Sequence, residues 1–128
     1  LGQNAVQGRP QREIRSTKMS AKFEIFLGSN RQYYFHLKAP NGEKILASEG
    51  YTTKANCQNG IQSVKVHSPY EVNYKKATST NWQYYFTLHA NNGQVIGVSE
   101  TYTTAQSRDG GIAAVKAYAP AAPVVDLS

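Results

Sequence analysis

The first clearly patterned part of the chain alternates apolar and polar residues with a period of two. The alternation runs through KFEIFLG at 22–28 and YYFHLKA at 33–39, and both segments are rich in aromatic and β-branched residues. Successive side chains of a strand point to opposite faces, so this pattern predicts two strands. On the second strand, one face carries Tyr33, Phe35 and Leu37, and the other carries Tyr34, His36 and Lys38.

A third strand and a helix are predicted to follow. The Asn-Gly pair at 41–42 supplies the positive φ angles of a tight hairpin turn, which predicts a strand over 44–48. Thr53 occupies a typical helix N-cap position, and Pro69 closes the helical stretch. Gly60 in mid-helix costs about 1 kcal/mol relative to alanine, and we interpret it as a point where helix and sheet approach closely. The predicted apolar face of the helix is Ala55, Cys57, Ile61 and Val64.

The chain repeats itself with a constant offset of 51 residues. Residues 23–69 align without gaps on residues 74–120, with 20 of 47 positions identical. QYYFHLKAPNG matches QYYFTLHANNG, SEGYTT matches SETYTT, and GIQSVK matches GIAAVK. Such a match predicts two copies of one structural unit related by a pseudo-twofold axis. In the second copy, the predicted apolar helix face is Ile112, Ala113 and Val115.

The repeat and the strand patterns together predict an α+β fold. Each unit has the order β-β-β-α-β, and a short strand at 124–127 ends the second unit. We expect residues 21–128 to form one domain with six to eight strands in a single antiparallel sheet. Two helices would cover one face of that sheet, the face lined by Phe35, Leu37, Phe86 and Leu88.

The ordered motifs YYF-x-L-x-A-x-NG, SE-x-YTT and GI-x-x-VK resemble the YegP-like family of small bacterial proteins of uncharacterised function. The resemblance covers residues 23–120, and TTAQSRDGGIAAVKA at 103–117 is similar to the second half of its tandem members. It implies a β-β-β-α-β unit that occurs twice, with the C-terminal strands exchanged between units. It implies no catalytic residues.

Composition and charge divide the chain into a basic tail and a folded part. Hydrophobic residues make up 40% and aromatic residues 11% of the 128 residues, which excludes wholesale disorder. Of the net charge of +6, residues 1–22 carry +4, so residues 1–20 are predicted to be a flexible basic tail. Met19 has the position of a natural start, and whether residues 1–18 are native stays open.

Several functional classes lack their sequence signals. There is no run of 18 apolar residues and no apolar stretch of a secretory signal at the start, so we expect a cytoplasmic protein without a membrane partner. Cys57 is the single cysteine, which excludes an internal disulfide and a cysteine zinc site. The glycine-rich loops that bind phosphates or dinucleotides are missing from the sequence, and no cofactor is expected.

The residues that could act in catalysis are not repeated. His36, His67 and His89 align with residues other than histidine in the opposite unit, and Cys57 aligns with Arg108. No nucleophile, base and orienting group recur together. The densest repeated polar cluster, SE-x-YTT at 48–53 and 99–104, is explained by capping and packing, and we favour that interpretation over a paired ligand site. The sequence therefore favours a module that is not an enzyme, most simply a monomer.

The sheet face opposite the helices is the predicted binding face. Exposed aromatic side chains between cations can stack bases and hold phosphates, so single-stranded nucleic acid is one candidate partner. A binding module with another ligand and an enzyme of unidentified activity remain alternatives. The candidate residues are Tyr34, His36, Lys38, Trp82, Tyr85 and His89.

Overall fold

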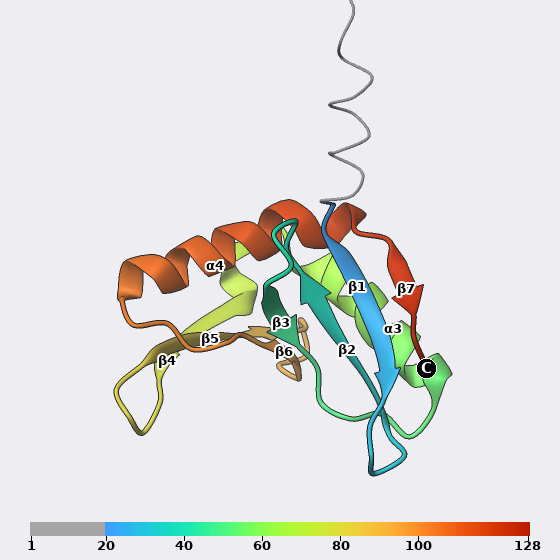
Figure 1. Cartoon of the computed structure of the whole chain (residues 1–128). Coiled ribbons are helices and arrows are strands. Elements are labelled where there is room, and N and C mark those ends of the chain that lie inside the picture. Colours follow the sequence, from blue (N-terminus) through green and yellow to red (C-terminus); the bar gives the residue numbers. More distant parts are fainter. Residues whose placement is uncertain (1–19) are drawn as a thin grey trace, which may run out of the picture.

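The computed structural model describes residues 20–128, so the predicted tail lies almost entirely outside the described residues (Figure 1). The first repeat comprises strands β1 (Lys22–Leu27), β2 (Tyr33–Lys38) and β3 (Lys44–Ala47) and helix α3 (Lys54–His67). The second comprises β4 (Tyr74–Thr78), β5 (Tyr84–His89), β6 (Val95–Val98) and α4 (Ala105–Tyr118). Short 3-10 helices, η1 (Glu71–Asn73) and η2 (Ala119–Ala121), follow the two long helices, and β7 (Val124–Asp126) ends the chain.

The seven strands form one sheet in the order β4-β5-β6-β3-β2-β1-β7. The two repeats meet where β3 and β6 pair antiparallel, with Ala47 opposite Val98. The predicted α+β fold with duplicated units is therefore confirmed. The order β-β-β-α-β holds for the second unit only, because the segment after α3 forms the 3-10 helix η1 where a fourth strand of the first unit was expected. The expected purely antiparallel pairing needs one correction, because β7 runs parallel to β1. The end of α4 lies beside the start of β1, so the chain enters this edge in the same direction as β1 (Figure 1).

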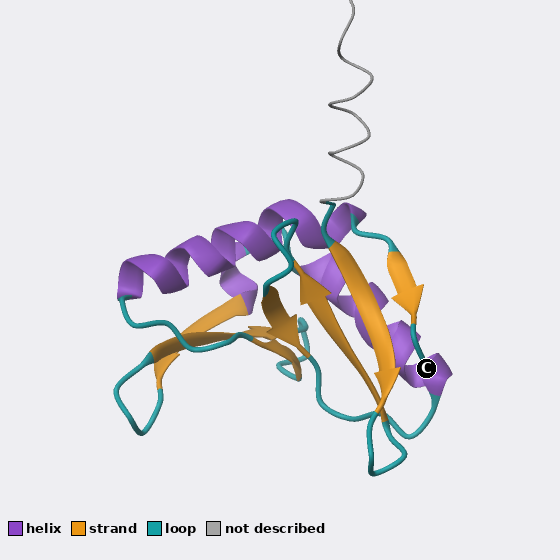
Figure 2. Cartoon of the chain, viewed as in Figure 1, coloured by secondary structure: helices purple, strands orange, loops and turns teal. Residues whose placement is uncertain are grey.

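Both helices cover the same face of the sheet, and the core lies between the two layers (Figure 2). Helix α3 contacts β2 of its own repeat and β5 and β6 of the other, while α4 contacts β5 and β3. The two repeats therefore share one core, whose fully buried side chains include Phe23, Ile25, Phe35, Leu37, Ile61, Val64, Phe86, Leu88 and Val115.

Two predicted core alanines, Ala55 and Ala113, are exposed. Ala55 lies two positions before buried Cys57 and therefore on the opposite side of the helix. Ala113 lies one position after buried Ile112 and therefore outside the buried face. Small residues do not distinguish the two sides of a helix by themselves, so the prediction at these two positions was wrong.

The mid-helix glycines mark close contacts between helix and sheet, as predicted. A Cβ atom built on Gly60 would collide with the hydroxyl oxygen of Tyr51 and lie 3.1 Å from a ring carbon of Phe35. Gly111 faces Tyr102 and Phe86 in the same way. The tyrosine of each SE-x-YTT motif therefore packs where the helix has no side chain.

The serine and the second threonine of each SE-x-YTT motif also have local structural roles. The Ser48 hydroxyl accepts from the Phe35 N–H at 2.9 Å and donates to the Glu49 carbonyl at 2.8 Å. Thr53 is the N-cap of α3, and its hydroxyl accepts from the Asn56 N–H at 3.1 Å. Equivalent bonds recur in the second repeat. These contacts account for the repeated serine and the repeated capping threonine without a ligand.

At the pseudo-twofold axis, the two repeats differ in side-chain volume. Leu46 in β3 corresponds to Gly97 in β6, and both residues are buried. A Cβ atom on Gly97 would lie 2.6–2.9 Å from three side-chain carbons of Leu46. One leucine therefore fills the space that the two equivalent positions share.

Candidate binding face

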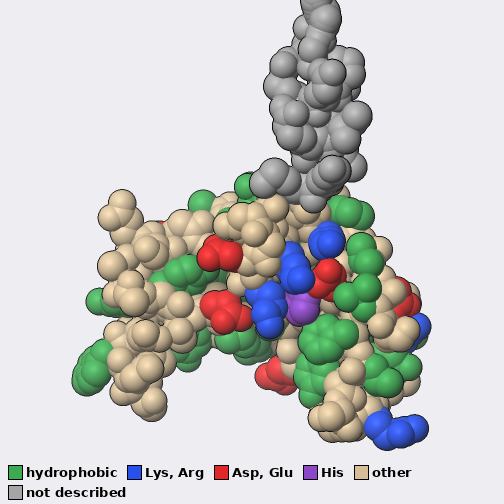
Figure 3. Space-filling view, in the orientation of Figure 1, with side chains coloured by type: hydrophobic (Ala, Val, Ile, Leu, Met, Phe, Trp, Pro, Cys, Tyr) green, Lys and Arg blue, Asp and Glu red, His purple; other side chains and the backbone are tan. Residues whose placement is uncertain are grey.

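The open face of the sheet, away from the helices, carries one dense group of side chains on β1 and β2. We call Lys22, Glu24, Phe26, Tyr34, His36 and Lys38 the first-repeat cluster. These residues alternate with the core residues of their strands, and the antiparallel register places Glu24 opposite His36 and Phe26 opposite Tyr34. In Figure 3, lysines gather around a histidine and an acidic group, next to an apolar patch.

Glu24 is the centre of the polar half of the cluster and is only 6% exposed. Its Oε1 atom lies 2.7 Å from His36 Nε2 and 3.1 Å from Lys38 Nζ, and its Oε2 atom lies 3.5 Å from Lys22 Nζ. The bond to His36, together with the bond and charge of Lys38, outweighs the cost of burial and lowers the pKa of Glu24 to about 2. The carboxylate is therefore ionised at neutral pH and fixes the orientation of its neighbours.

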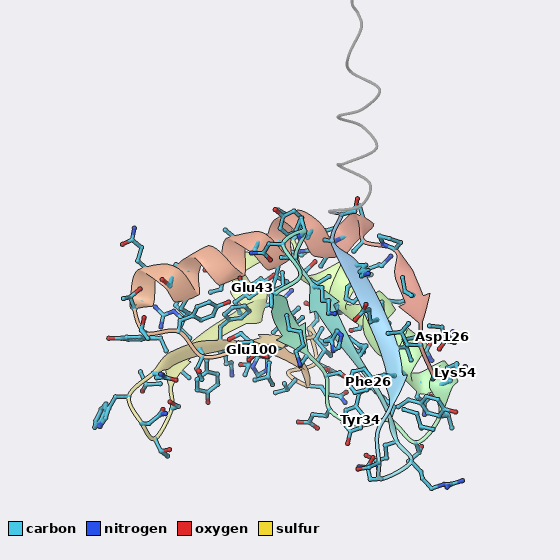
Figure 4. The ribbon with its side chains drawn as sticks, viewed as in Figure 1. Phe26, Tyr34, Glu43, Lys54, Glu100 and Asp126 are labelled. Carbon is cyan, nitrogen blue, oxygen red and sulfur yellow. The ribbon has the colours of Figure 1, made fainter. Side chains whose placement is uncertain are left out.

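The other half of the cluster is aromatic. The rings of Phe26 and Tyr34 stack with centroids 5.7 Å apart and an interplanar angle of 16°. The His36 ring lies 5.0 Å from that of Phe26, and the Tyr34 hydroxyl accepts from Asn30 Nδ2 at 2.8 Å. Figure 4 shows Phe26 and Tyr34 side by side on β1 and β2. All three rings are half-buried, so part of this ordered apolar surface faces solvent.

The second repeat does not reproduce this cluster on its own open face. Its counterparts there include Lys75 for Glu24, Ala77 for Phe26 and Thr87 for His36. His89 replaces Lys38, and its two ring nitrogens contact the Gly93 carbonyl at 3.0 Å and the Thr87 hydroxyl at 2.8 Å. The carbonyl can only accept, so Nδ1 donates to it, and the hydroxyl occupies Nε2. The first-repeat cluster is thus built once on a backbone that occurs twice.

The six predicted binding-face residues fall into three places. Tyr34, His36 and Lys38 belong to the first-repeat cluster, whereas Tyr85 and His89 lie on β5, separated from β2 by β6 and β3. The structure does not bring these two groups together.

Trp82 is not on the face at all. It lies in the turn between β4 and β5 with a φ of 67° and is 83% exposed. Its counterpart Arg31 has the same φ. This left-handed conformation is typical of a turn and not of a strand.

Three cluster members were missed by the sequence prediction. Lys22, Glu24 and Phe26 alternate with the core residues of the first segment, so the period of two already carried the signal. What the sequence lacked was the register between β1 and β2, which sets Glu24 against His36.

The remaining histidine and the cysteine have structural environments. Cys57 is fully buried, and burial raises the pKa of its thiol to about 11, so the thiol stays protonated at neutral pH. His67 Nδ1 lies 2.8 Å from the carbonyl oxygen of Ser63 in its own helix. Within residues 20–128, His, Cys, Asp and Glu side chains form no group of three that could hold a metal ion.

Comparison with known proteins identifies the family. The model of the domain of unknown function DUF1508 matches residues 29–74 and again residues 79–126, one match for each repeat. The chain belongs to this family.

Relatives in several bacteria align over most of both chains. The UPF0339 protein YegP of Shigella flexneri is 50% identical over 108 residues, which are 84% of this chain and 98% of the relative. A UPF0339 protein of Bordetella pertussis is 49% identical over 108 residues, 84% of this chain and 96% of the relative. The resemblance to the YegP-like family is therefore confirmed.

Two solution NMR structures have the same fold. The yegP protein of E. coli, described as of unknown function, has a TM-score of 0.80 and 49% identity and covers 85% of this chain and 94% of its own. A UPF0339 protein of Shewanella oneidensis, with a TM-score of 0.80 and 44% identity, covers 84% of this chain and 92% of its own. Among residues 20–128, no helix has the length and apolar character needed to cross a membrane.

Proposed function

We propose that the protein is a binding module without catalytic activity, and that the first-repeat cluster is its ligand site. The observation that carries this proposal is the asymmetry of the open face. Residues that the shared fold needs, such as Gly60 and Gly111, occur in both repeats, whereas the cluster around Glu24 and Phe26 occurs in one. Side chains that only one copy carries are free to serve a ligand.

The environments of the reactive side chains support a role without catalysis. His36 and Glu24 form the kind of pair that can orient a general base, but Glu24 is shared with two lysines. The protonated Cys57 thiol and the engaged ring nitrogens of His89 are poorly suited to nucleophilic or base catalysis. A turnover screen tests this: activity that is lost on substitution of His36, Cys57 or His89, with the fold intact, would overturn the proposal.

Single-stranded nucleic acid is the ligand class that the chemistry of the cluster favours. The stacked rings of Phe26 and Tyr34 offer an apolar platform, and Lys22 and Lys38 flank Glu24 beside it, two cations against one carboxylate. Aromatic platforms next to cations bind bases and phosphates with little dependence on sequence. The second repeat, with Ala77 in place of Phe26, lacks the ring pair.

Fluorescence anisotropy on labelled single-stranded oligonucleotides at low salt tests this ligand class. Tyr34→Ala is expected to weaken binding by about 1–3 kcal/mol for each base that stacks on the ring. Tyr85→Ala, its counterpart in the second repeat, is the matched control and is expected to have a smaller effect. Affinity is expected to fall steeply with salt, because phosphate contacts release counterions.

The same titration separates the folded domain from the basic tail. The full chain is compared with a chain that starts at Met19. If binding disappears with the tail and is insensitive to Tyr34→Ala, it is nonspecific charge attraction and the cluster is not the site. No binding by either protein at low salt removes nucleic acid as a ligand.

We further expect a monomer, because the two repeats complete one shared core within a single chain. Sedimentation velocity checks the oligomeric state. A dimer whose population does not change with dilution contradicts the expectation.

A further inference from the structure

The equivalent strands β1 and β4 lie near opposite edges of the sheet, and only β1 is covered by a further strand. At the β1 edge, β7 pairs parallel to β1. The Phe23 N–H of β1 donates to the Pro123 carbonyl, and the Leu127 N–H donates to the Ile25 carbonyl of β1, both at 2.8 Å. At the opposite edge, no strand of residues 20–128 pairs with the outer side of β4. Because β1 and β4 are equivalent strands of the repeat, β7 on β1 shows how a segment can add to β4.

The repeat also indicates which backbone groups of β4 point outward. The two residues of β1 that bond to the β7 segment correspond to Tyr74 and Lys76, and Thr78 is the next position on the same side. The Tyr74 N–H already donates to the Glu71 carbonyl. Lys76 and Thr78 therefore present the outward peptide groups to which an added strand can bond.

A shallow groove of about 210 Å³ lies beside this edge, between β4 and α4. It is lined by Ile112 and Ala113 and by two ion pairs, Lys76 with Asp109 and Lys116 with Glu71. At the other edge, β7 directs Asp126 toward the helix layer, where it pairs with Lys54 at 2.9 Å (Figure 4). A strand on β4 would similarly direct every second side chain toward the groove.

The charges on β4 indicate the kind of segment that fits. Lys75 and Lys76 are both exposed, and lysines on an edge strand oppose pairing with a second copy of the same strand. Lys76 pairs with Asp109 at 3.3 Å, but Lys75 has no ion pair within residues 20–128. Lys75 lies on the open-face side, so an acidic residue opposite it would be attracted.

We propose that the outer edge of β4 is a docking site for an extended segment of a partner protein in which apolar residues alternate with acidic ones. The segment adds parallel to β4, as β7 adds to β1. Its apolar residues face the groove beside α4, and its acidic residues face Lys75. Lys75, which helps to keep two copies of the chain apart, thus selects an acidic partner.

The probe is the acetylated peptide Pro-Val-Glu-Val-Glu-Leu-Ser, titrated into the ¹⁵N-labelled full chain. We expect saturable amide shifts over β4 and the facing side of α4. Thr78→Pro removes an outward N–H without touching the bonds to β5, so the fold is kept and binding weakens about tenfold or more. Thr78→Val keeps the N–H and is the matched control, with affinity close to that of the parent chain.

A second arm tests the charge selection. A peptide with lysines in place of the glutamates is expected to bind at least about tenfold more weakly, and Lys75→Glu is expected to reverse that order. The proposal is overturned if millimolar peptide causes no saturable amide shifts, or if the shifts are confined to the β1 edge. It is also overturned if both peptides bind equally, or if Thr78→Pro leaves the affinity for the acidic peptide unchanged.

Discussion

Replacing Glu24 with glutamine tests whether the buried carboxylate holds the first-repeat cluster together. The pKa of Glu24 is about 2 in the folded protein against an ordinary value of 4.5. Each unit of that difference corresponds to 1.36 kcal/mol, so ionised Glu24 contributes about 3 kcal/mol to the free energy of unfolding at pH 7. Glu24→Gln keeps the size of the side chain and is expected to remove most of this contribution.

The sign of the pH dependence follows from the direction of the pKa shift. A carboxyl group whose pKa is lowered by folding stabilises the protein above its unfolded pKa and loses that effect as the pH falls toward 2. The difference in unfolding free energy between the parent chain and Glu24→Gln is therefore expected to shrink from about 3 kcal/mol at pH 7 to about 1 kcal/mol at pH 3.

Urea unfolding followed by circular dichroism measures this difference at both pH values. Fluorescence is a poorer probe, because the single tryptophan, Trp82, is 83% exposed in the folded state. Exposed Glu100→Gln serves as the control and is expected to stay within about 0.5 kcal/mol of the parent chain. A difference for Glu24→Gln that is equally large at pH 3 and pH 7 refutes the reasoning, because it would come from packing and not from charge.

Three further predictions concern contacts within and between the repeats. Gly97→Ala is expected to destabilise the protein by about 1–3 kcal/mol, and a Leu46→Ala background is expected to remove most of that cost in a double-mutant cycle measured by urea unfolding. Gly60→Ala is expected to lower the thermal midpoint, although alanine favours helices more than glycine does. Adding Tyr51→Phe removes the colliding hydroxyl and is expected to restore part of the loss. A higher midpoint for Gly60→Ala alone contradicts the close approach of helix and sheet. Thr104→Ala removes the N-cap of α4 and is expected to cost about 1 kcal/mol in the same unfolding assay, whereas no change would contradict the capping role.

The sequence predicted those parts of the fold that show either the 51-residue repeat or the alternation of apolar and polar residues. The caps Thr53 and Thr104 and the alternation around Phe35 depend on local backbone preferences that the sequence displays directly. The parallel placement of β7 was not predictable in this way, because it depends on where α4 ends relative to β1. Pairing across the sheet is a property of the assembled fold and has no local sequence signal.

The candidate site was predicted in part for the same reason. Tyr34, His36 and Lys38 share one strand, so alternation alone placed them on one face. Tyr85 and His89 lie on the same open face but form a separate group, because the order of the strands puts β6 and β3 between the two sets. Distance across a sheet depends on strand order, and that order followed from the way the two repeats join.

The junction between the repeats shows what joining two units in one chain permits. Near the axis, Leu46 occupies space that a side chain at the equivalent position 97 would also need, since even a Cβ atom there lies 2.6–2.9 Å from Leu46 carbons. Two identical units would have to place the same residue at both positions, so leucine in both would overpack the core and glycine in both would leave a cavity. A single chain resolves this by carrying leucine once and glycine once. The same freedom lets the open face carry Glu24 and Phe26 in one repeat while Lys75 and Ala77 occupy the other, so the asymmetry at the core and the asymmetry at the candidate site have one structural origin.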